Sequence, residues 1–118
     1  MEKTLPTQHL LVDLFGISKD KLSNQDFFLQ LLKDTVNSQL SLLSDPILKN
    51  LPSGGYTGVL LFETGHLCFR AHPEANHLAI DVFLQDEIDP EKIFALWAKN
   101  FSPEMIRKTT ITRGLYDF

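Results

Sequence analysis

Apolar residues recur along the chain with two different periods, and each period predicts a different element. The segment HLLVDLFG (9–16) is rich in strand-forming residues and ends at a glycine, which predicts a strand. Segment 17–40 has a helical period instead. Ser23 and Asp26 are spaced as a capping pair at its start. Its large apolar residues share one helical face, which indicates core packing: Phe27, Phe28, Leu31, Leu32 and Val36.

The middle of the chain predicts strands separated by turns. Segment 40–51 alternates like a strand, but Asp45-Pro46 would force a bulge or an edge position. PSGGYTG (52–58) has the composition of a loop. The segments VLLF and HLCFR flank ETG within 59–70, which is the clearest hairpin pattern in the chain. LAIDVFL (78–84) predicts another strand.

The last part of the chain predicts one helix and one strand. In DEIDPEKIFALWAKNF (86–101), Asp89 stands as N-cap and Pro90 at the first helical position. The apolar face of this helix is predicted to comprise Ile93, Leu96, Trp97 and Phe101. Residues 105–114 predict a final strand that ends at Gly114.

The order of these elements predicts an α+β fold in a single domain, 1–118. Runs of strands between two distant helices favour an antiparallel sheet with two helices on one face, a two-layer sandwich. In segment 66–72, Leu67, Phe69 and Ala71 alternate with His66, Cys68, Arg70 and His72, so the first set should face the helices. Segment 78–84 is apolar on both faces. We therefore expect a second molecule to cover the open face of the sheet.

Composition and charge narrow the classes of function. The chain has 118 residues with 43% hydrophobic and 22% charged residues, as in a soluble globular domain. A net charge of -4 and the lack of a Lys/Arg cluster argue against nucleic-acid binding. Apolar runs are too short to cross a membrane, and the N-terminus MEKTLPTQ is too polar for a signal peptide. A single cysteine, Cys68, is typical of a reducing compartment, so we expect a cytoplasmic protein.

The motifs of this chain resemble, in order and spacing, those of the short bacterial and archaeal S-adenosylmethionine decarboxylases. The shared segments are HLLVDLFG, SGGYTGVLLFETGHLCFRAHPE, AIDVF, the DP that opens the second helix, and the closing TRG. The resemblance runs from about His9 to Gly114. It implies that the open sheet face of each protomer pairs with a second copy, giving a four-layer αββα dimer.

The resemblance also implies a specific chemistry. Family members are inactive proenzymes that cut themselves within a Glu-Ser-His-Leu segment at this hairpin and turn the serine into a pyruvoyl group. The ketone of that group forms a Schiff base with the substrate amine and withdraws electrons as carbon dioxide leaves. A histidine on the adjoining strand and a cysteine in the next one assist processing and protonation.

All three reactive family positions differ in this chain. The serine falls on Gly65, which has no side chain and cannot attack a carbonyl. The histidine falls on Arg70, which stays protonated and cannot act as a base. The cysteine falls on Gln85, which does not titrate. We therefore predict that the chain has no catalytic residues of the family type, does not cut itself and carries no pyruvoyl group.

Two neighbouring side chains could replace the missing reactive groups, but neither is well placed for it. Thr64 has a hydroxyl, but it sits one residue early, so the strand pleat should turn it to the opposite side. Cys68 shares the open face with the site but is offset from both reactive positions. A lone cysteine is more often a small apolar filler than a reactive group.

Part of a binding pocket is expected to remain. Glu74 matches the glutamate of the family's Pro-Glu motif, which holds the substrate ribose, although a solvated loop carboxylate explains it equally well. His72 and Leu51 stand where the family has aromatic residues, and imidazole can stack on adenine over a smaller area. Arg70 could meet a carboxylate or phosphate, or pair with Asp81 across the sheet. The candidate ligand-binding residues are Leu51, His66, Arg70, His72 and Glu74.

The four histidines do not predict a metal site. His9, His66, His72 and His77 lack the spacings that are typical of metal motifs, so surface or interface positions are the better interpretation.

Three functions remain open at this point. The first is a non-catalytic dimer that binds a metabolite or regulates spermidine synthesis, with an adenosyl or polyamine-like ligand and either a second copy or an active paralogue as partner. The second is an active pyruvoyl-type decarboxylase processed at a non-standard residue. The third is a structural dimer without ligand. The first is favoured because the scaffold motifs are intact while the reactive side chains are missing.

Overall fold

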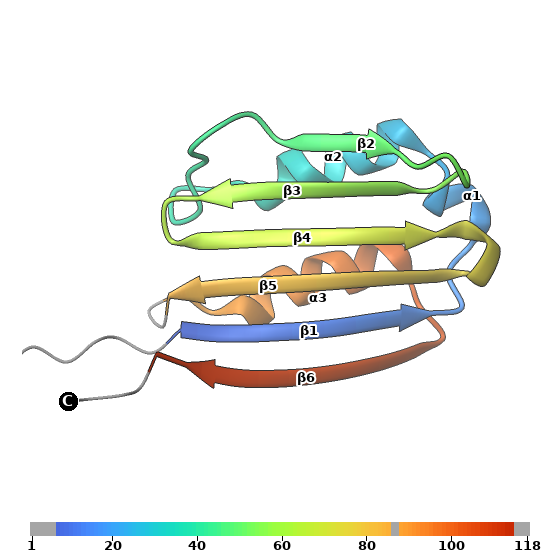
Figure 1. Ribbon diagram of the computed structural model, residues 1–118. Coiled ribbons are helices and arrows are strands. Elements are labelled where there is room, and N and C mark those ends of the chain that lie inside the picture. The colour runs from blue at the N-terminus through green and yellow to red at the C-terminus, as the bar shows by residue number, and fades with distance from the viewer. Residues whose placement is uncertain (1–6, 86–87, 115–118) are drawn as a thin grey trace, which may run out of the picture.

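The computed structural model of the chain describes residues 7–85 and 88–114, which form a two-layer α+β sandwich (Figure 1). The elements in chain order are β1 Thr7–Phe15, α1 Lys19–Leu22, α2 Gln25–Thr35, β2 Ile47–Asn50, β3 Tyr56–Phe62, β4 Gly65–His72, the 3-10 turn η1 Pro73–Ala75, β5 His77–Gln85, α3 Pro90–Phe101 and β6 Met105–Arg113. The polar N-terminal residues 1–6 and the start of the segment expected to be helical, 86–87, lie outside the described residues.

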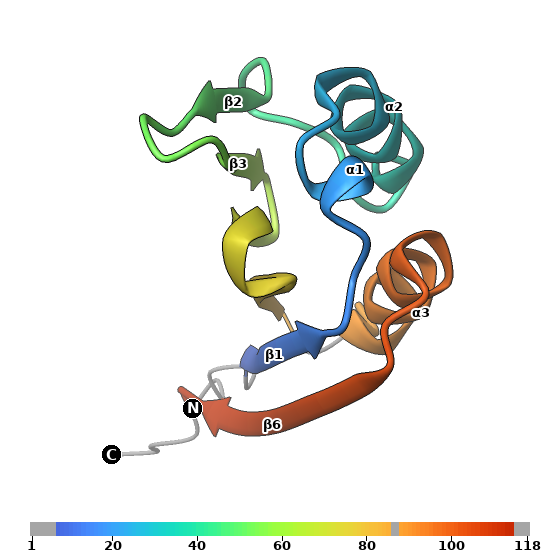
Figure 2. The same cartoon turned by 90° about the vertical axis from the view of Figure 1, so that its right-hand side faces the viewer.

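The strands form one six-stranded sheet in the order β2-β3-β4-β5-β1-β6. Every neighbouring pair is antiparallel. Figure 2 shows α2 and α3 on the same side of this sheet, and none of the described helices lies on the opposite side. The predicted α+β class, with an antiparallel sheet and helices on one face, is confirmed.

The predicted first helix is split, because the chain is capped twice. Ser18 Oγ accepts a hydrogen bond from the N–H of Lys21 and caps the start of α1, which ends at Leu22 with Ser23 as its C-cap. Asn24 Oδ1 then accepts from the N–H of Phe27 at 3.1 Å and begins α2. The expected capping pair at Ser23 is therefore wrong, since Asn24 is an equally good cap one residue later.

Three predicted boundaries in the middle of the chain shift. Asp45-Pro46 precedes β2, which is an edge strand as expected. Part of the predicted loop 52–58 belongs to β3, which begins at Tyr56. The hairpin turn consists of two residues, Glu63 and Thr64, because Gly65 already pairs with Phe62 in the ladder.

The second predicted helix matches α3. Asp89 Oδ1 accepts a hydrogen bond from the N–H of Glu91 at 2.9 Å, as expected of the N-cap. The predicted apolar face is buried at Ile93, Trp97 and Phe101, and Leu96 packs at its margin.

Aromatic side chains join the two layers. The ring of Phe28 on α2 stacks on Phe69 of β4 with centroids 5.0 Å apart. Trp97 is fully buried and donates its indole N–H to Thr35 Oγ1 at 3.0 Å. The Thr35 hydroxyl in turn donates to the carbonyl of Leu31 at 2.7 Å. Thr35 is the one buried polar residue among those described, and this chain of hydrogen bonds satisfies it.

The uncovered side of the sheet, which we call the open face, is built by alternate residues of each strand. On β4, Leu67, Phe69 and Ala71 are buried against the helices, as predicted. Cross-strand partners share a face, so the ladder register assigns the rest. The open face comprises Ile47, Lys49, Thr57, Val59, Leu61, His66, Cys68, Arg70, His72, His77, Ala79, Asp81, Phe83, Gln85, Thr7, His9, Leu11, Asp13, Phe15, Met105, Arg107, Thr109, Ile111 and Arg113.

No helix in the described parts of the chain is both long and apolar enough to span a bilayer.

We expect Thr35→Val to lower the free energy of unfolding by about 1–3 kcal/mol, because it leaves the buried Trp97 N–H without an acceptor. Thr110→Val on the exposed helix-side surface of β6 is the matched control and should stay within about 0.5 kcal/mol of wild type. Urea denaturation followed by tryptophan fluorescence measures both. Equal effects of the two substitutions would contradict the role given to Thr35.

Candidate functional site

The end of the sheet formed by the β3–β4 hairpin holds two of the three reactive family positions. Gly65 pairs with Leu84 in the ladder, and the N–H of Gln85 donates to the carbonyl of Thr64 at 3.0 Å. Backbone hydrogen bonds thus hold the start of β4 against the end of β5. Arg70 lies five residues further along β4, where it pairs with Ala79.

The backbone at Gly65 leaves no room for a side chain. A Cβ atom there would overlap the carbonyl oxygen of Phe83 and lie 2.9 Å from that residue's carbonyl carbon and 3.0 Å from Leu84 Cα. Gly65 also has a φ of +153°, which L residues rarely adopt. The position therefore fits glycine, and a serine side chain there would push β4 and β5 apart.

The other two family positions present polar side chains to solvent. Arg70 and Gln85 are both exposed, and both lie on the open side of the sheet by register. The alternative pairing of Arg70 with Asp81 does not occur among the described residues. Asp81 Oδ1 instead lies 3.6 Å from His9 Nε2 on the neighbouring strand β1.

The two substitute groups differ in their surroundings. Thr64 lies in the turn, so the strand pleat that was expected to turn it away does not apply to it. Its Oγ1 is buried and has no hydrogen-bond partner among the described residues. Cys68 is half-buried on the open face. Burial, with a smaller contribution from the Asp81 carboxylate, raises the pKa of the Cys68 thiol, so it stays protonated near neutral pH and is a poor nucleophile.

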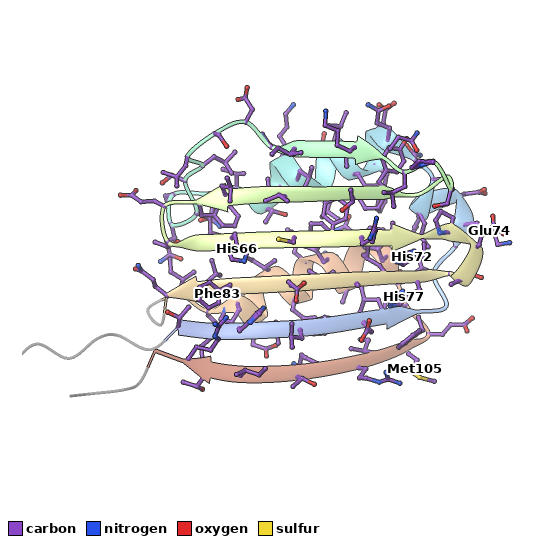
Figure 3. The ribbon with its side chains drawn as sticks, in the orientation of Figure 1. His66, His72, Glu74, His77, Phe83 and Met105 are labelled. Atoms are coloured by element: carbon purple, nitrogen blue, oxygen red, sulfur yellow. The ribbon has the colours of Figure 1, made fainter. Side chains whose placement is uncertain are left out.

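The candidate ligand-binding residues gather mostly at the opposite end of the sheet. Figure 3 shows His66 at one end of β4, with His72 and Glu74 at the other. The loop that carries Leu51 reaches the same end as His72, since a Cβ at Gly55 in that loop would press on the backbone of Ala71. Seven residues of extended strand separate Gly65 from His72, a span of about 23 Å. Within one protomer His66 therefore lies too far from the other four candidate residues to share one ligand with them.

His72 and Glu74 have different environments. The imidazole of His72 lies parallel to that of His77, with ring centroids 5.5 Å apart and an interplanar angle of 6°. The Glu74 side chain is 86% exposed and lies 4.0 Å from Lys19 Nζ. An exposed pair of this kind contributes little to stability.

The sequence analysis missed an aromatic and acidic cluster next to His72. His77 Nε2 lies 2.8 Å from Asp13 Oδ1, and the His77 ring also stacks on Phe15 at 5.1 Å. The guanidinium of Arg107 lies over the same Phe15 ring. The alternation of polar and apolar residues in 9–15 was the available signal, because it places Asp13 and Phe15 on one face. Within the described ranges, no three His, Cys, Asp or Glu residues are grouped to hold a metal ion.

A groove that the sequence did not reveal lies on the helix layer. It has a volume of about 740 Å³ and runs between α2 and the segment before β2. Its lining residues are Asp26, Leu29, Gln30, Leu32, Lys33, Val36, Leu42 and Pro46. None of the candidate ligand-binding residues reaches it.

Comparisons with known proteins agree with this architecture. The family model for S-adenosylmethionine decarboxylase matches residues 8–114. An S-adenosylmethionine decarboxylase proenzyme of Sulfurihydrogenibium sp. is 38% identical over 119 residues, covering 98% of this chain and 86% of the relative. A proenzyme of the same name from Clostridium botulinum is 27% identical over 110 residues, covering 92% of this chain and 95% of the relative.

A solved structure extends the similarity to three dimensions. The crystal structure of the adenosylmethionine decarboxylase from Aquifex aeolicus superposes with a TM-score of 0.80 at 28% sequence identity. The match covers 98% of this chain and 96% of that one. The likeness thus spans the whole sandwich.

We expect Gly65→Ala to destabilise the protein by about 1–3 kcal/mol more than Gly54→Ala, because only the first substitution overlaps another strand. Gly54 is a matched control, since it also has a positive φ, +102°, but has open space around its Cβ position. Thermal and urea unfolding of both variants give the comparison. If the two alanines cost the same, the hairpin can yield and Gly65 is not sterically required.

Proposed function

The chain belongs to the S-adenosylmethionine decarboxylase family, and we propose that it is a member that neither cuts itself nor decarboxylates. In this proposal it is a dimeric metabolite-binding or regulatory protein of polyamine synthesis, the route to spermidine. Its ligand would be an adenosyl or polyamine-like molecule. The partner in the dimer is a second copy, and an active paralogue is the alternative.

One observation carries the loss of self-processing. The cut requires a side-chain hydroxyl that attacks the preceding carbonyl, and position 65 has neither the hydroxyl nor the space for one. The residues present do not fit a pyruvoyl group at this position. Arg70 and Gln85 also support the loss of activity, because a permanently protonated guanidinium and a neutral amide cannot exchange protons with a substrate.

The division of the site between two ends of the sheet supports a dimer. If two open faces stack about a two-fold axis at right angles to the strands, the Gly65 end of one copy lies over the His72 end of the other. A ligand between the copies would then meet His66 of one chain together with Arg70, His72 and Glu74 of its partner. His66 and His72, about 20 Å apart in one protomer, would then contribute to the same site.

A second candidate function is an active decarboxylase processed before Thr64. The observation that favours it is the buried Thr64 Oγ1, which has no partner among the described residues and is therefore free to react. The threonine lies beside position 65, and its product would carry an extra methyl group. The crowded backbone at Gly65 speaks against the rearrangement that this cut needs.

The intact mass separates these two candidates. We expect purified protein to show a single chain of 13.4 kDa that borohydride treatment in the presence of an amine does not modify. Processing before Thr64 would instead give fragments near 1–63 and 64–118, and a ketone that reduction traps. Finding those fragments would overturn the proposed loss of self-cleavage.

Ligand binding is tested by thermal shift with S-adenosylmethionine, decarboxylated S-adenosylmethionine and spermidine. We expect a rise in Tm of a few degrees with at least one of them, since binding at 100 times Kd adds about 2.7 kcal/mol. Glu74→Gln should reduce the rise, because an amide accepts fewer hydrogen bonds from two hydroxyls. Glu91→Gln on α3 is the matched control and should leave the rise unchanged. No shift with any of the three ligands would favour a structural dimer.

A further inference from the structure

Two residue types are confined to the open face. Every arginine and every histidine of the sequence falls in the described ranges, and the ladder register places all of them on that face: His9, His66, Arg70, His72, His77, Arg107 and Arg113. Arginine and aromatic residues are enriched where proteins meet, whereas lysine is depleted there. Lysine is depleted on the open face in the same way, because Lys49 is the one described lysine that lies there.

The open face is also the positive side of an acidic protein. The open face carries four positive side chains, Lys49, Arg70, Arg107 and Arg113, and two carboxylates, Asp13 and Asp81. With its histidines neutral, the face therefore has a net charge of +2, whereas the whole chain has a net charge of -4. Protonation of the four histidines would raise the face to +6. Its charge thus depends on pH far more than that of the helix layer, which carries no histidine.

We infer that the open face binds a second copy of this chain only while its histidines are neutral, so that acidification separates the dimer. This inference rests on the proposed dimer and adds its regulation. Two like faces at +2 each can associate when apolar burial outweighs a modest repulsion, but two faces at +6 each cannot.

The size and apolar content of the face fit a second copy. Six strands about 4.8 Å apart and about eight residues long outline roughly 700 Å², close to the roughly 800 Å² per partner of a standard interface. Its apolar side chains include Ile47, Leu61, Met105 and Ile111, which are between 41% and 61% exposed in the single chain. Covering them supplies the favourable term for association.

Two of the four histidines have a carboxylate beside them. His77 Nε2 lies 2.8 Å from Asp13 and His9 Nε2 lies 3.6 Å from Asp81. A protonated imidazole at either place would be balanced by its neighbour, so these two histidines tolerate acid in a buried interface.

Among the described residues, neither of the other two histidines has a carboxylate within 4 Å of its ring nitrogens. His66 lies beside the Phe83 ring, centroids 5.3 Å apart, and the guanidinium of Arg113 lies over the same ring. Cys68 adjoins it on β4, and its thiol is uncharged. His72 stacks on His77, with Arg70 two residues before it on the same strand. A proton on His66 or His72 therefore adds charge that no carboxylate of the same chain lies close enough to pair with.

The direction of the pH effect follows from proton linkage. Burial against a second positive face disfavours the charged form of an imidazole, so the separated chains bind more protons than the dimer. Association is then strongest above the usual titration range of histidine, near pH 6.5, and weakens as the pH falls through that range. Each imidazole that titrates one pH unit lower in the dimer changes the dissociation constant tenfold at low pH.

Sedimentation velocity on the full chain between pH 8.0 and 5.5, at constant ionic strength, tests the inference. We expect the dimer dissociation constant to rise at least about tenfold over this range. The fluorescence of buried Trp97 should stay native while the dimer separates. An unchanged dissociation constant, or separation that only accompanies unfolding, would overturn the inference and leave the dimer itself standing. A monomer at pH 8.0 would overturn the proposed dimer as well.

Paired variants assign the effect to particular histidines. The double substitution His66→Gln and His72→Gln should keep the dimer together at pH 5.5 and remove most of the pH dependence. The matched control, His9→Gln with His77→Gln, changes as many histidines and should retain the wild-type dependence. The inference fails if the control removes the dependence and the first double variant does not.

Discussion

The carbonyl oxygen of Phe83 occupies the space in which a side chain at position 65 would begin. Strands β4 and β5 can approach so closely at this end only because residue 65 has no Cβ, and the hydrogen bond from Gln85 to Thr64 closes the same end. The backbone packing that holds the hairpin is therefore the packing that excludes a nucleophile. A single serine substitution would therefore disturb the packing of β4 against β5.

Much of the fold could be predicted from local sequence signals. Asp89-Pro90 fixed the start of α3 because both residues act within the first helical turn, and the alternation in 66–72 correctly separated the two faces of β4. The cap of α2 was harder to predict, since Ser23 and Asn24 are both good cap residues and the local sequence does not distinguish them. Competing local signals of equal strength need tertiary contacts to resolve them.

The candidate site was less accessible to sequence reasoning. Gly65 could be recognised as lacking a hydroxyl, but the clash that forbids a side chain depends on a strand eighteen residues away in the chain. The candidate binding residues looked like one site because they are close in sequence, whereas an extended strand carries His72 far from Gly65. The pairing of Asp13 with His77 joins residues 64 positions apart and needed the register of β1 and β5.

The exposed strand β6 has a consequence for solubility. It is an edge of the sheet, all nine of its residues are exposed, and its free backbone groups could template another strand. Arg107, Lys108 and Arg113 place three positive charges along this edge. An incoming copy would bring the same charges and would have to strip water from them, so the molecule is protected from growing into fibrils strand by strand.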